Sequence, residues 1–212
     1  MKVLYIDTTT SYLYTGIVVE GKLIEEIQTD FGKDLSSVAL KKISEMLEKS
    51  NLKPNDIDKI IVVNGPGSFT GSRVGVTIAK TYAYSLKKDI TTITSLEAMA
   101  ASCADDSYKI PIIDARRGYV YGAIFNKENE IVLKQQYIKL DTIKCAAENL
   151  VDKFTYISNQ NFDGILTKKY KPDIENIVNI YSNKENENPH SVDPIYLKLT
   201  EAEEKQKLEL IW

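Results

Sequence analysis

Apolar residues follow the same pattern in the two halves of the chain. In the first half, a run of apolar residues ends at Asp7, a polar turn follows, and apolar positions then alternate up to Ile17. Residues 109–124 repeat this arrangement without a gap, with Asp114 in place of Asp7 and Ile124 in place of Ile17. Short alternating runs joined by turns favour antiparallel strands, so the repeat predicts one hairpin in each half.

The segments after each hairpin also correspond. A further strand is predicted at residues 23–29 and 130–140, a helix at 36–49 and 141–153, and a strand at 59–63 and 155–158. In the first half a second helix follows at 74–88. A duplicated β-β-β-α-β-α unit is the plan of actin-like (ASKHA, RNase H-like) proteins, so we predict an α/β fold of two lobes. We assign residues 1–104 to the first lobe, with a subunit interface, and residues 105–212 to a shorter second lobe.

The end of the chain has the pattern of one more helix. Thr200 and Glu203 have the spacing of a capping box, and the last residues, 208–212, are largely apolar. The apolar side of this predicted C-terminal helix can pack on its own lobe, which we slightly favour, on the first lobe, or on a partner.

Two predicted helices carry residues suited to close packing. In the helix at 36–49, an apolar stripe at helical spacing consists of Val38, Ala39, Ile43, Met46 and Leu47. At the helix 74–88 and the turn before it, a ridge of small residues recurs every fourth position: Gly71, Gly75, Ala79 and Ala83. Glycines in a helix cost about 1 kcal/mol each relative to alanine, so a close neighbour is expected to offset them. That neighbour is this chain's own structure or a helix of another subunit, and the spacing favours neither.

The predicted strand 59–63 leads into a glycine turn that contains Gly65, Gly67 and Ser68. A strand, a glycine turn and a helix N-terminus can together bind an anion, because free backbone N–H groups and the helix dipole converge there. The turn lacks the Gly-Lys-Ser/Thr ending of a P-loop and the third glycine of a dinucleotide fingerprint. Its glycines can instead permit a sharp turn, with Ser68 or Thr70 capping the helix, and spacing alone favours this second interpretation.

Composition and charge limit which partners the chain can bind alone and in which compartment it is expected. The formal net charge is −3, from 27 basic and 30 acidic residues, so the chain lacks the basic excess expected of a protein that binds nucleic acid alone. Its apolar runs are too short to cross a bilayer, and Asp7 interrupts the N-terminal run before a signal-peptide core forms. We therefore expect a cytoplasmic protein without membrane contact.

Few residues offer catalytic chemistry. His190 is the sole histidine, so metal and catalytic-triad sites lack partners for it, and Cys103 and Cys145 are expected to be buried small residues. Asp7 and Asp114 stand where active actin-like ATPases keep acidic residues. The residues after them, Thr8-Thr9-Thr10 and Ala115-Arg116-Arg117, replace the glycines that would let backbone N–H groups approach a phosphate. Arg116 can still attract an anion, so Asp7, Gly65, Gly67, Ser68 and Arg116 are weak anion or nucleotide candidates.

Several motifs together resemble the bacterial TsaB family, also called YeaZ. The most specific of them is the glycine turn Gly-Pro-Gly-Ser-Phe-Thr-Gly at residues 65–71, followed by Arg73 and Gly75. Supporting motifs, in the family's order, are Ile-Asp-Thr at 6–8, Thr-Ser-Leu at 94–96, Ile-Asp-Ala-Arg at 113–116, Gly-Tyr-Val-Tyr at 118–121 and Pro-Ile-Tyr-Leu at 194–197. They span nearly the whole chain.

This resemblance implies a non-catalytic scaffold or activator in threonylcarbamoyladenosine modification of tRNA, at the adenosine next to the anticodon. The implied partners are a TsaD-like catalytic paralogue and a TsaE-like ATPase, with ATP and metal bound on those subunits, no cofactor on this chain, and tRNA held only through the complex. It further implies that the two first-lobe helices form the contact with the paralogue, or a homodimer when the chain is alone. The interface residues are then Val38, Ile43, Met46, Gly71, Gly75, Ile78, Ala79, Tyr82 and Ala83.

One position departs from the family pattern, and two other functions remain open. Leu35 stands where family members commonly have a histidine before the first helix. An actin-like ATPase or small-molecule kinase is the main alternative, supported by Asp7, Asp114 and the glycine turn. A peptidase is the weaker one, since a lone histidine leaves too few ligands for a metal.

Overall fold

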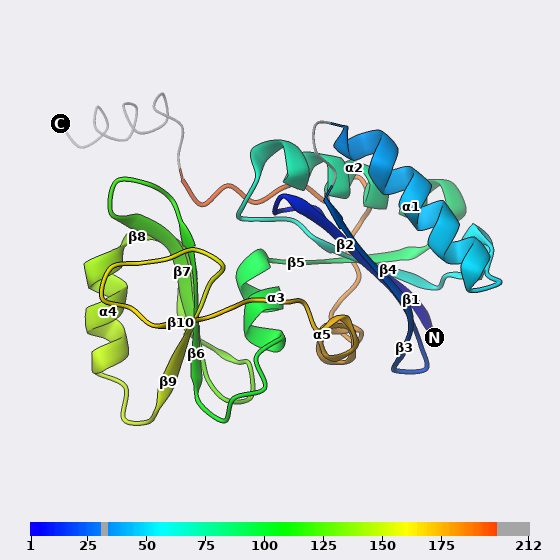
Figure 1. Cartoon of the computed structure of the whole chain (residues 1–212). Coiled ribbons are helices and arrows are strands. Elements are labelled where there is room, and N and C mark those ends of the chain that lie inside the picture. The colour runs from blue at the N-terminus through cyan, green and yellow to red at the C-terminus, as the bar shows by residue number, and fades with distance from the viewer. Residues whose placement is uncertain (31–33, 199–212) are drawn as a thin grey trace.

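The computed structural model describes residues 1–30 and 34–198, which form two five-stranded sheets covered by helices (Figure 1). The strand order is β3-β2-β1-β4-β5 in the first sheet and β8-β7-β6-β9-β10 in the second. Read in chain order, the two sheets are built identically. The predicted α/β fold of two duplicated actin-like lobes is therefore confirmed.

The first sheet follows the predicted meander and crossover. Strand β1 pairs antiparallel with β2 and parallel with β4, and β4 pairs parallel with β5. Its central strands are buried on both faces, as their continuous apolar runs require. The elements of this half are β1 (Lys2–Asp7), β2 (Tyr12–Val19), β3 (Lys22–Asp30), α1 (Leu35–Lys49), the 3-10 helix η1 (Pro54–Asp56), β4 (Lys59–Val63), α2 (Phe69–Leu86), β5 (Asp89–Ile93) and α3 (Ser95–Ala101).

The second sheet repeats this pairing with β6, β7, β8, β9 and β10. One helix of the first unit has no counterpart in the second: β9 is followed by a loop and by β10, with no described helix between them. The elements are β6 (Tyr108–Asp114), β7 (Tyr119–Phe125), β8 (Ile131–Lys139), α4 (Leu140–Glu148), β9 (Phe154–Ile157), β10 (Thr167–Lys168) and α5 (Ile174–Tyr181).

Element boundaries agree with the sequence pattern best where apolar runs are sharply bounded. Strand β4 has the predicted bounds 59–63, whereas α4 ends at Glu148 rather than at residue 153. Helix α2 begins at Phe69, five residues before the predicted start at 74, because the Ser68 hydroxyl accepts a hydrogen bond from the Gly71 amide and caps the helix.

Each sheet packs between helices on its two faces. Helices α1 and α2 cover one face of the first sheet, and α3 and α5 cover the other. In the second sheet, α4 covers one face and α3 covers the other. Helix α3 therefore lies between the two lobes and contributes to both cores (Figure 1).

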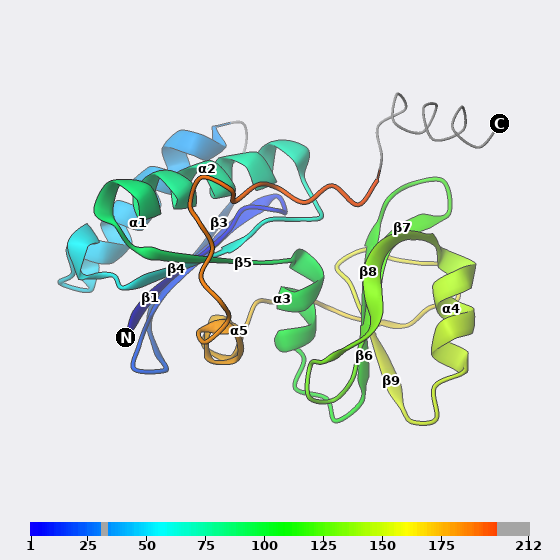
Figure 2. The ribbon, with the colours of Figure 1, turned by 180° about the vertical axis from the view of Figure 1, so that it is seen from behind.

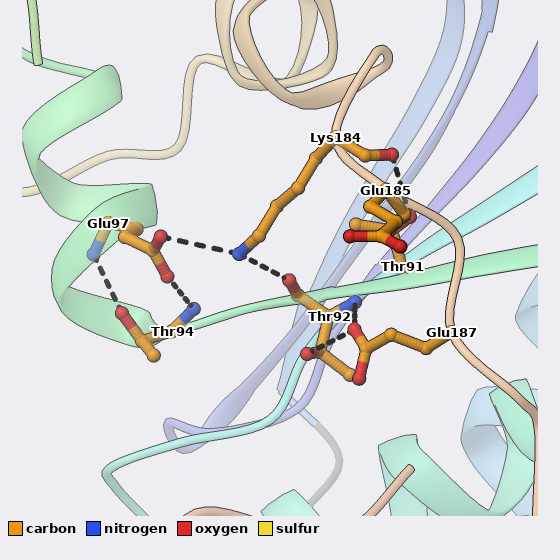
Figure 3. Close-up of polar contacts among 7 residues, drawn as sticks. All are labelled: Thr91, Thr92, Thr94, Glu97, Lys184, Glu185 and Glu187. Carbon is orange, nitrogen blue, oxygen red and sulfur yellow. Dashed lines mark hydrogen bonds and ion pairs between the residues drawn. The ribbon is translucent and has the colours of Figure 1, made fainter. Parts of the chain in front are cut away.

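The chain returns to the first lobe after the second sheet (Figure 2). Helix α5 packs on the first sheet, and residues 182–198, called here the return segment, run along strand β5 toward α2. Figure 3 shows how two side chains of this segment close the β5 edge. Glu187 accepts hydrogen bonds from the Thr92 amide and hydroxyl, both at 2.7 Å, and the Lys184 ammonium donates to the Thr92 carbonyl and pairs with Glu97. Together with the Glu187 amide, which donates to the Ile90 carbonyl, these side chains replace the missing neighbour of an edge strand.

The predicted division between residues 104 and 105 falls in the connection from α3 to β6, and the domain bounds stay a prediction. Residues 174–198 follow the second sheet in sequence but lie against the first. The predicted C-terminal helix at 200–212 lies outside the described residues. Among the residues that are described, no helix is both long and apolar enough to cross a membrane.

Candidate functional site

A cleft of about 550 Å³ opens between the lobes, at the carboxyl ends of β1, β4, β6 and β9. Crevices at this edge of an α/β sheet are the usual place for ligands. Polar and aromatic side chains from both lobes form its wall, together with the glycine turn. The residues that line it are Asp7, Thr9, Thr10, Ser11, Tyr12, Tyr14, Pro66, Gly67, Ser68, Ser95, Met99, Ile113, Asp114, Tyr121, Ser158, Asn159, Gln160, Lys169 and Tyr170.

Asp7 ends β1 at the bottom of the cleft and is 1% exposed. Its Oδ1 accepts hydrogen bonds from the backbone amide and the hydroxyl of Thr9, at 2.8 and 2.7 Å. Burial nevertheless raises the pKa of the Asp7 carboxyl to about 6, because desolvation of the charge outweighs the opposing effect of these bonds. Such a carboxyl could exchange a proton near neutral pH, but neither a histidine nor a cysteine is among the residues lining this cleft.

The glycine turn is closed by the loop that follows Asp7. The Ser68 amide donates to the Thr9 carbonyl at 2.7 Å. A Cβ at Gly67 would lie 2.4 Å from the Thr9 carbonyl oxygen, and one at Gly71 would lie 1.9 Å from that of Thr8. The turn therefore lets two backbone segments approach closely, which agrees with the packing and capping interpretation of its sequence.

The five anion candidates do not converge. Asp7, Gly67 and Ser68 line the cleft, whereas Gly65 faces the carbonyl of Ile195 behind the turn. Arg116 is exposed in the β6–β7 turn and is not among the lining residues. As anion or nucleotide ligands these residues stay predictions.

The ridge of small residues on α2 faces the protein's own sheet. Gly71 and Gly75 lie against Thr8, since a Cβ at Gly75 would meet the Thr8 hydroxyl oxygen at 2.3 Å, and Ala79 and Ala83 are buried in the first core. Ile43 and Met46 of α1 are buried in the same core, and so is Leu35. These buried residues cannot contact another subunit without displacing the helices from the sheet, and as interface residues they stay predictions.

The outer surface of α1 and α2 carries a different apolar groove, of about 590 Å³. Ile78 and Tyr82 of the predicted interface border it, and Val38 is half-buried nearby on α1. Leu40, which is 57% exposed, and Val74 also line the groove and were not among the residues predicted from the sequence. Their signal in the sequence was an apolar residue outside the main stripe of each helix. The groove is lined by Ser36, Leu40, Pro54, Arg73, Val74, Thr77, Ile78, Thr81, Tyr82, Ser85 and Leu86.

The remaining candidates for chemistry lie apart from both sites. The imidazole of His190 stacks edge-on against Tyr84, with 4.6 Å between ring centroids. Cys103 is buried as predicted, but Cys145 is exposed on α4, which corrects the expectation that both thiols are buried. Within residues 1–30 and 34–198, no group of three or more His, Cys, Asp or Glu side chains is placed to hold a metal.

Sequence comparisons agree on one group of proteins. The family model "TsaD: tRNA N6-adenosine threonylcarbamoyltransferase" matches residues 29–188. The chain is 32% identical to the tRNA threonylcarbamoyladenosine biosynthesis protein TsaB of Bacillus subtilis, over 97% of each chain. It is also 32% identical to the protein of the same name from Haemophilus influenzae, over 57% of this chain and 52% of that one.

Solved structures show the same fold. YeaZ from Pseudomonas aeruginosa superposes with a TM-score of 0.73, covering 92% of this chain and 99% of that chain, at 16% identity. A second Pseudomonas aeruginosa structure, described as an uncharacterized protein with similarity to peptidase YeaZ, gives a TM-score of 0.76 over 93% of this chain and 99% of that chain, also at 16% identity. At this identity the likeness concerns the fold alone.

Proposed function

This chain matches the TsaD family model and belongs to the TsaB (YeaZ) family of tRNA threonylcarbamoyladenosine biosynthesis proteins. From that premise we propose that it is a non-catalytic scaffold subunit. It binds a TsaD-like catalytic paralogue through the outer surface of α1 and α2. In this assembly the paralogue transfers threonylcarbamoyl to the adenosine next to the anticodon of tRNA.

The observation that carries the proposal is the apolar groove between α1 and α2. Most of its exposed wall is apolar although it faces solvent and includes Arg73 and four serine or threonine side chains, and exposed apolar surface of this kind is typical of binding sites. Leu40 is 57% exposed within it, whereas the stripe of α1 that packs inward is buried. A helix-lined groove of this kind fits a helix of a partner with the same architecture.

The state of the interlobe cleft supports a non-catalytic role. In the loop after Asp7, the Thr9 carbonyl accepts a hydrogen bond from the Ser68 amide of the glycine turn. The Thr9 amide and hydroxyl are in turn occupied by the Asp7 carboxylate. Backbone donors that an ATPase would direct at a phosphate are thus used within the chain.

The other parts of the assembly follow from this assignment. ATP and metal are bound on the partner subunits, a TsaE-like ATPase joins the complex, and this chain itself needs no cofactor. When the paralogue is absent, the same α1–α2 surface supports a homodimer. We place the complex in the cytoplasm.

Light scattering on a sizing column tests the proposal, with the chain run alone and mixed with the TsaD-like paralogue of the same cell. The wild-type chain should form a mixed complex. Leu40→Glu should weaken that complex by about 10-fold or more, because a charge would be buried in the apolar groove. The matched control is Val151→Glu, which places the same charge on a fully exposed apolar position of the second lobe.

Two results would contradict the proposal. A Leu40→Glu complex as tight as the wild type would exclude the groove as the interface. ATP hydrolysis by the purified chain, abolished by Asp7→Ala, would contradict the non-catalytic role and favour the ATPase or kinase alternative.

A further inference from the structure

Three tyrosines form a surface cluster on the second sheet, called here the tyrosine platform: Tyr119, Tyr121 and Tyr137. The rings of Tyr119 and Tyr137 are stacked, with centroids 4.6 Å apart and an interplanar angle of 7°. Tyr121 pairs with Tyr137 across β7 and β8, with centroids 5.9 Å apart. All three residues are half-buried, so part of the cluster is accessible from solvent.

The platform lies on the sheet face opposite α4. Val120 and Gly122, which alternate with these tyrosines along β7, face α4: Val120 belongs to its core, and a Cβ at Gly122 would touch Ile143. Tyr119 and Tyr121 therefore project from the other face. Tyr121 also lines the interlobe cleft, so the platform is continuous with the mouth of that cleft.

Basic groups surround the platform. Lys139 is paired with Tyr119 across the two strands, so its side chain emerges on the same face. The Lys198 ammonium lies 5.5 Å from the Tyr137 ring centroid. Figures 1 and 2 both show the end of the described chain beside the ends of β7 and β8. Arg116 and Arg117 are exposed in the turn that leads into Tyr119, and no described carboxylate forms an ion pair with either.

Both turn arginines have left-handed backbone conformations, with φ of 69° for Arg116 and 56° for Arg117. Residues with a Cβ rarely adopt this region, and glycine or asparagine is favoured in such turns. The side chains are exposed, so core packing does not account for two arginines here. Strain of this kind at a surface turn points to a function of the side chains.

Stacked aromatic rings with nearby unpaired guanidinium groups match the chemistry of single-stranded nucleic acid. Bases stack on aromatic faces, and arginines bind phosphate oxygens through paired N–H donors. An acidic peptide would use the arginines but not the flat rings. Asp114, at the start of this turn, accepts a hydrogen bond from the Arg116 amide and lines the cleft, so phosphates are favoured on the outer side of the turn.

We propose that the tyrosine platform and the Arg116–Arg117 turn bind an unpaired segment of tRNA, with a base on the outer face of Tyr119 and phosphates at the two arginines. This inference rests on the proposed function, because the low affinity expected of an acidic chain becomes useful only when the paralogue holds the same tRNA. It assigns this chain a direct contact with tRNA, whereas the sequence suggested contact only through the complex.

The experiment measures binding of an unmodified tRNA transcript to the assembled complex with the TsaD-like paralogue, by fluorescence anisotropy over a range of salt concentrations. Tyr119→Ala should weaken binding by about 10-fold, and Tyr119→Phe should retain it, because stacking needs the ring and not the hydroxyl. Arg116→Ala with Arg117→Ala should lower the slope of log Kd against log salt by about 1 to 2. The matched control, Lys144→Ala with Lys153→Ala, removes two charges elsewhere on the second lobe.

The outcomes separate this inference from the proposed function. If the complex forms and all variants bind tRNA like the wild type, the platform is not an RNA site, while the scaffold assignment stands. If the platform variants lower the mass of the complex instead of its tRNA affinity, the surface binds a protein and the inference is wrong. A wild-type chain that forms no complex overturns the scaffold assignment, and this inference with it.

Discussion

The turn after Asp7 and the turn after Asp114 occupy equivalent places in the two lobes but have opposite surroundings. Asp7 is 1% exposed, and the loop after it is covered by the glycine turn that precedes α2. Asp114 is exposed, and the loop after it, with Arg116 and Arg117, reaches solvent. Thr8 and Thr9 of the first turn are thus buried, whereas Arg116 and Arg117 of the second turn are exposed.

The difference comes from the element that follows the fourth strand of each unit. In the first lobe β4 leads into the glycine turn and α2, which pack on the hairpin. In the second lobe β9 leads into a loop and β10, and no described helix takes the place of α2. The first hairpin is therefore covered by α2, whereas the turn of the second hairpin is exposed and its side chains can contact a ligand. Three changes test this comparison.

The largest loss of stability is expected from replacing Gly71 of α2, which packs on the turn after Asp7, whereas replacing Gly118, in the turn after Asp114, should have a small effect. Gly71→Ala would place a Cβ 1.9 Å from the Thr8 carbonyl oxygen, which is backbone and cannot rotate away. We expect it to lower the free energy of unfolding by about 4 kcal/mol, measured by urea denaturation. The matched change, Gly118→Ala, meets no atom within 4 Å and has only its φ of 76° against it. It should cost about 1 kcal/mol.

Equal losses for the two variants would contradict the closed and open descriptions of the turns. A small loss for Gly71→Ala would mean that α2 can move away from the Thr8–Thr9 backbone without disturbing the core.

The pH dependence of stability should distinguish the buried carboxyl of Asp7. The pKa of Asp7 in the folded protein is about 6, above the ordinary value of 3.8, so the folded state favours the protonated carboxyl. The stability that this preference provides is fully present below about pH 4 and is lost as the pH rises through 6. Asp7→Asn keeps an oxygen to accept the Thr9 hydrogen bonds but cannot ionise. The unfolding free energy of the variant minus that of the wild type should therefore increase by about 3 kcal/mol between pH 4 and pH 7.

Denaturant unfolding of both proteins across this pH range provides the measurement. Asp114→Asn removes a carboxylate from the open turn and should leave the Asp7-dependent change in place. A constant difference between Asp7→Asn and the wild type would show that Asp7 is hydrated in the folded protein.

The smallest of the three effects concerns the edge strand β5, which the return segment closes only in the first lobe. Glu187→Ala would leave the Thr92 amide and hydroxyl without their acceptor and should cost about 1 to 2 kcal/mol. Hydrogen exchange at Thr92 should become faster, since the amide would open to solvent. Glu187→Gln, which retains an acceptor oxygen, should lose less. Unchanged exchange at Thr92 in Glu187→Ala would show that the segment does not protect this edge.

Much of the fold could be predicted from the sequence because its signals are local. The apolar run of β4 and the repeat of the Asp7 hairpin at Asp114 were sufficient for β4 and for the two hairpins β1–β2 and β6–β7. The return segment could not be predicted, since its bonds join Glu187 and Lys184 to Thr92, more than 90 residues away in sequence. Polar residues 182–188 gave no periodic signal from which that edge contact could be recognised.

The candidate sites show the same division. The sequence singled out Asp7, Ser68 and the glycine turn, but not that the turn is closed by the Thr9 carbonyl. It predicted an interface on α1 and α2, the helices that border the proposed groove, but mainly with residues that are buried against the sheet, and it omitted Leu40. Whether an apolar side chain such as that of Leu40 is exposed depends on where the neighbouring helix packs, which the local sequence does not specify.

The sequence by itself determined β1 to β4, α1 and α2 and the counterparts β6 to β9 and α4, because hydrophobic periodicity and turn residues specify local structure. It did not indicate β5, α3, β10 or α5, or that the second unit lacks a described counterpart of α2. It also determined that one ridge of α2, from Gly71 to Ala83, must approach something closely. Only the tertiary structure decided that this neighbour is the protein's own Thr8 and first sheet. Periodicity identifies which face of a helix is buried, but the surface that buries it comes from residues distant in the chain, and their packing selects the partner.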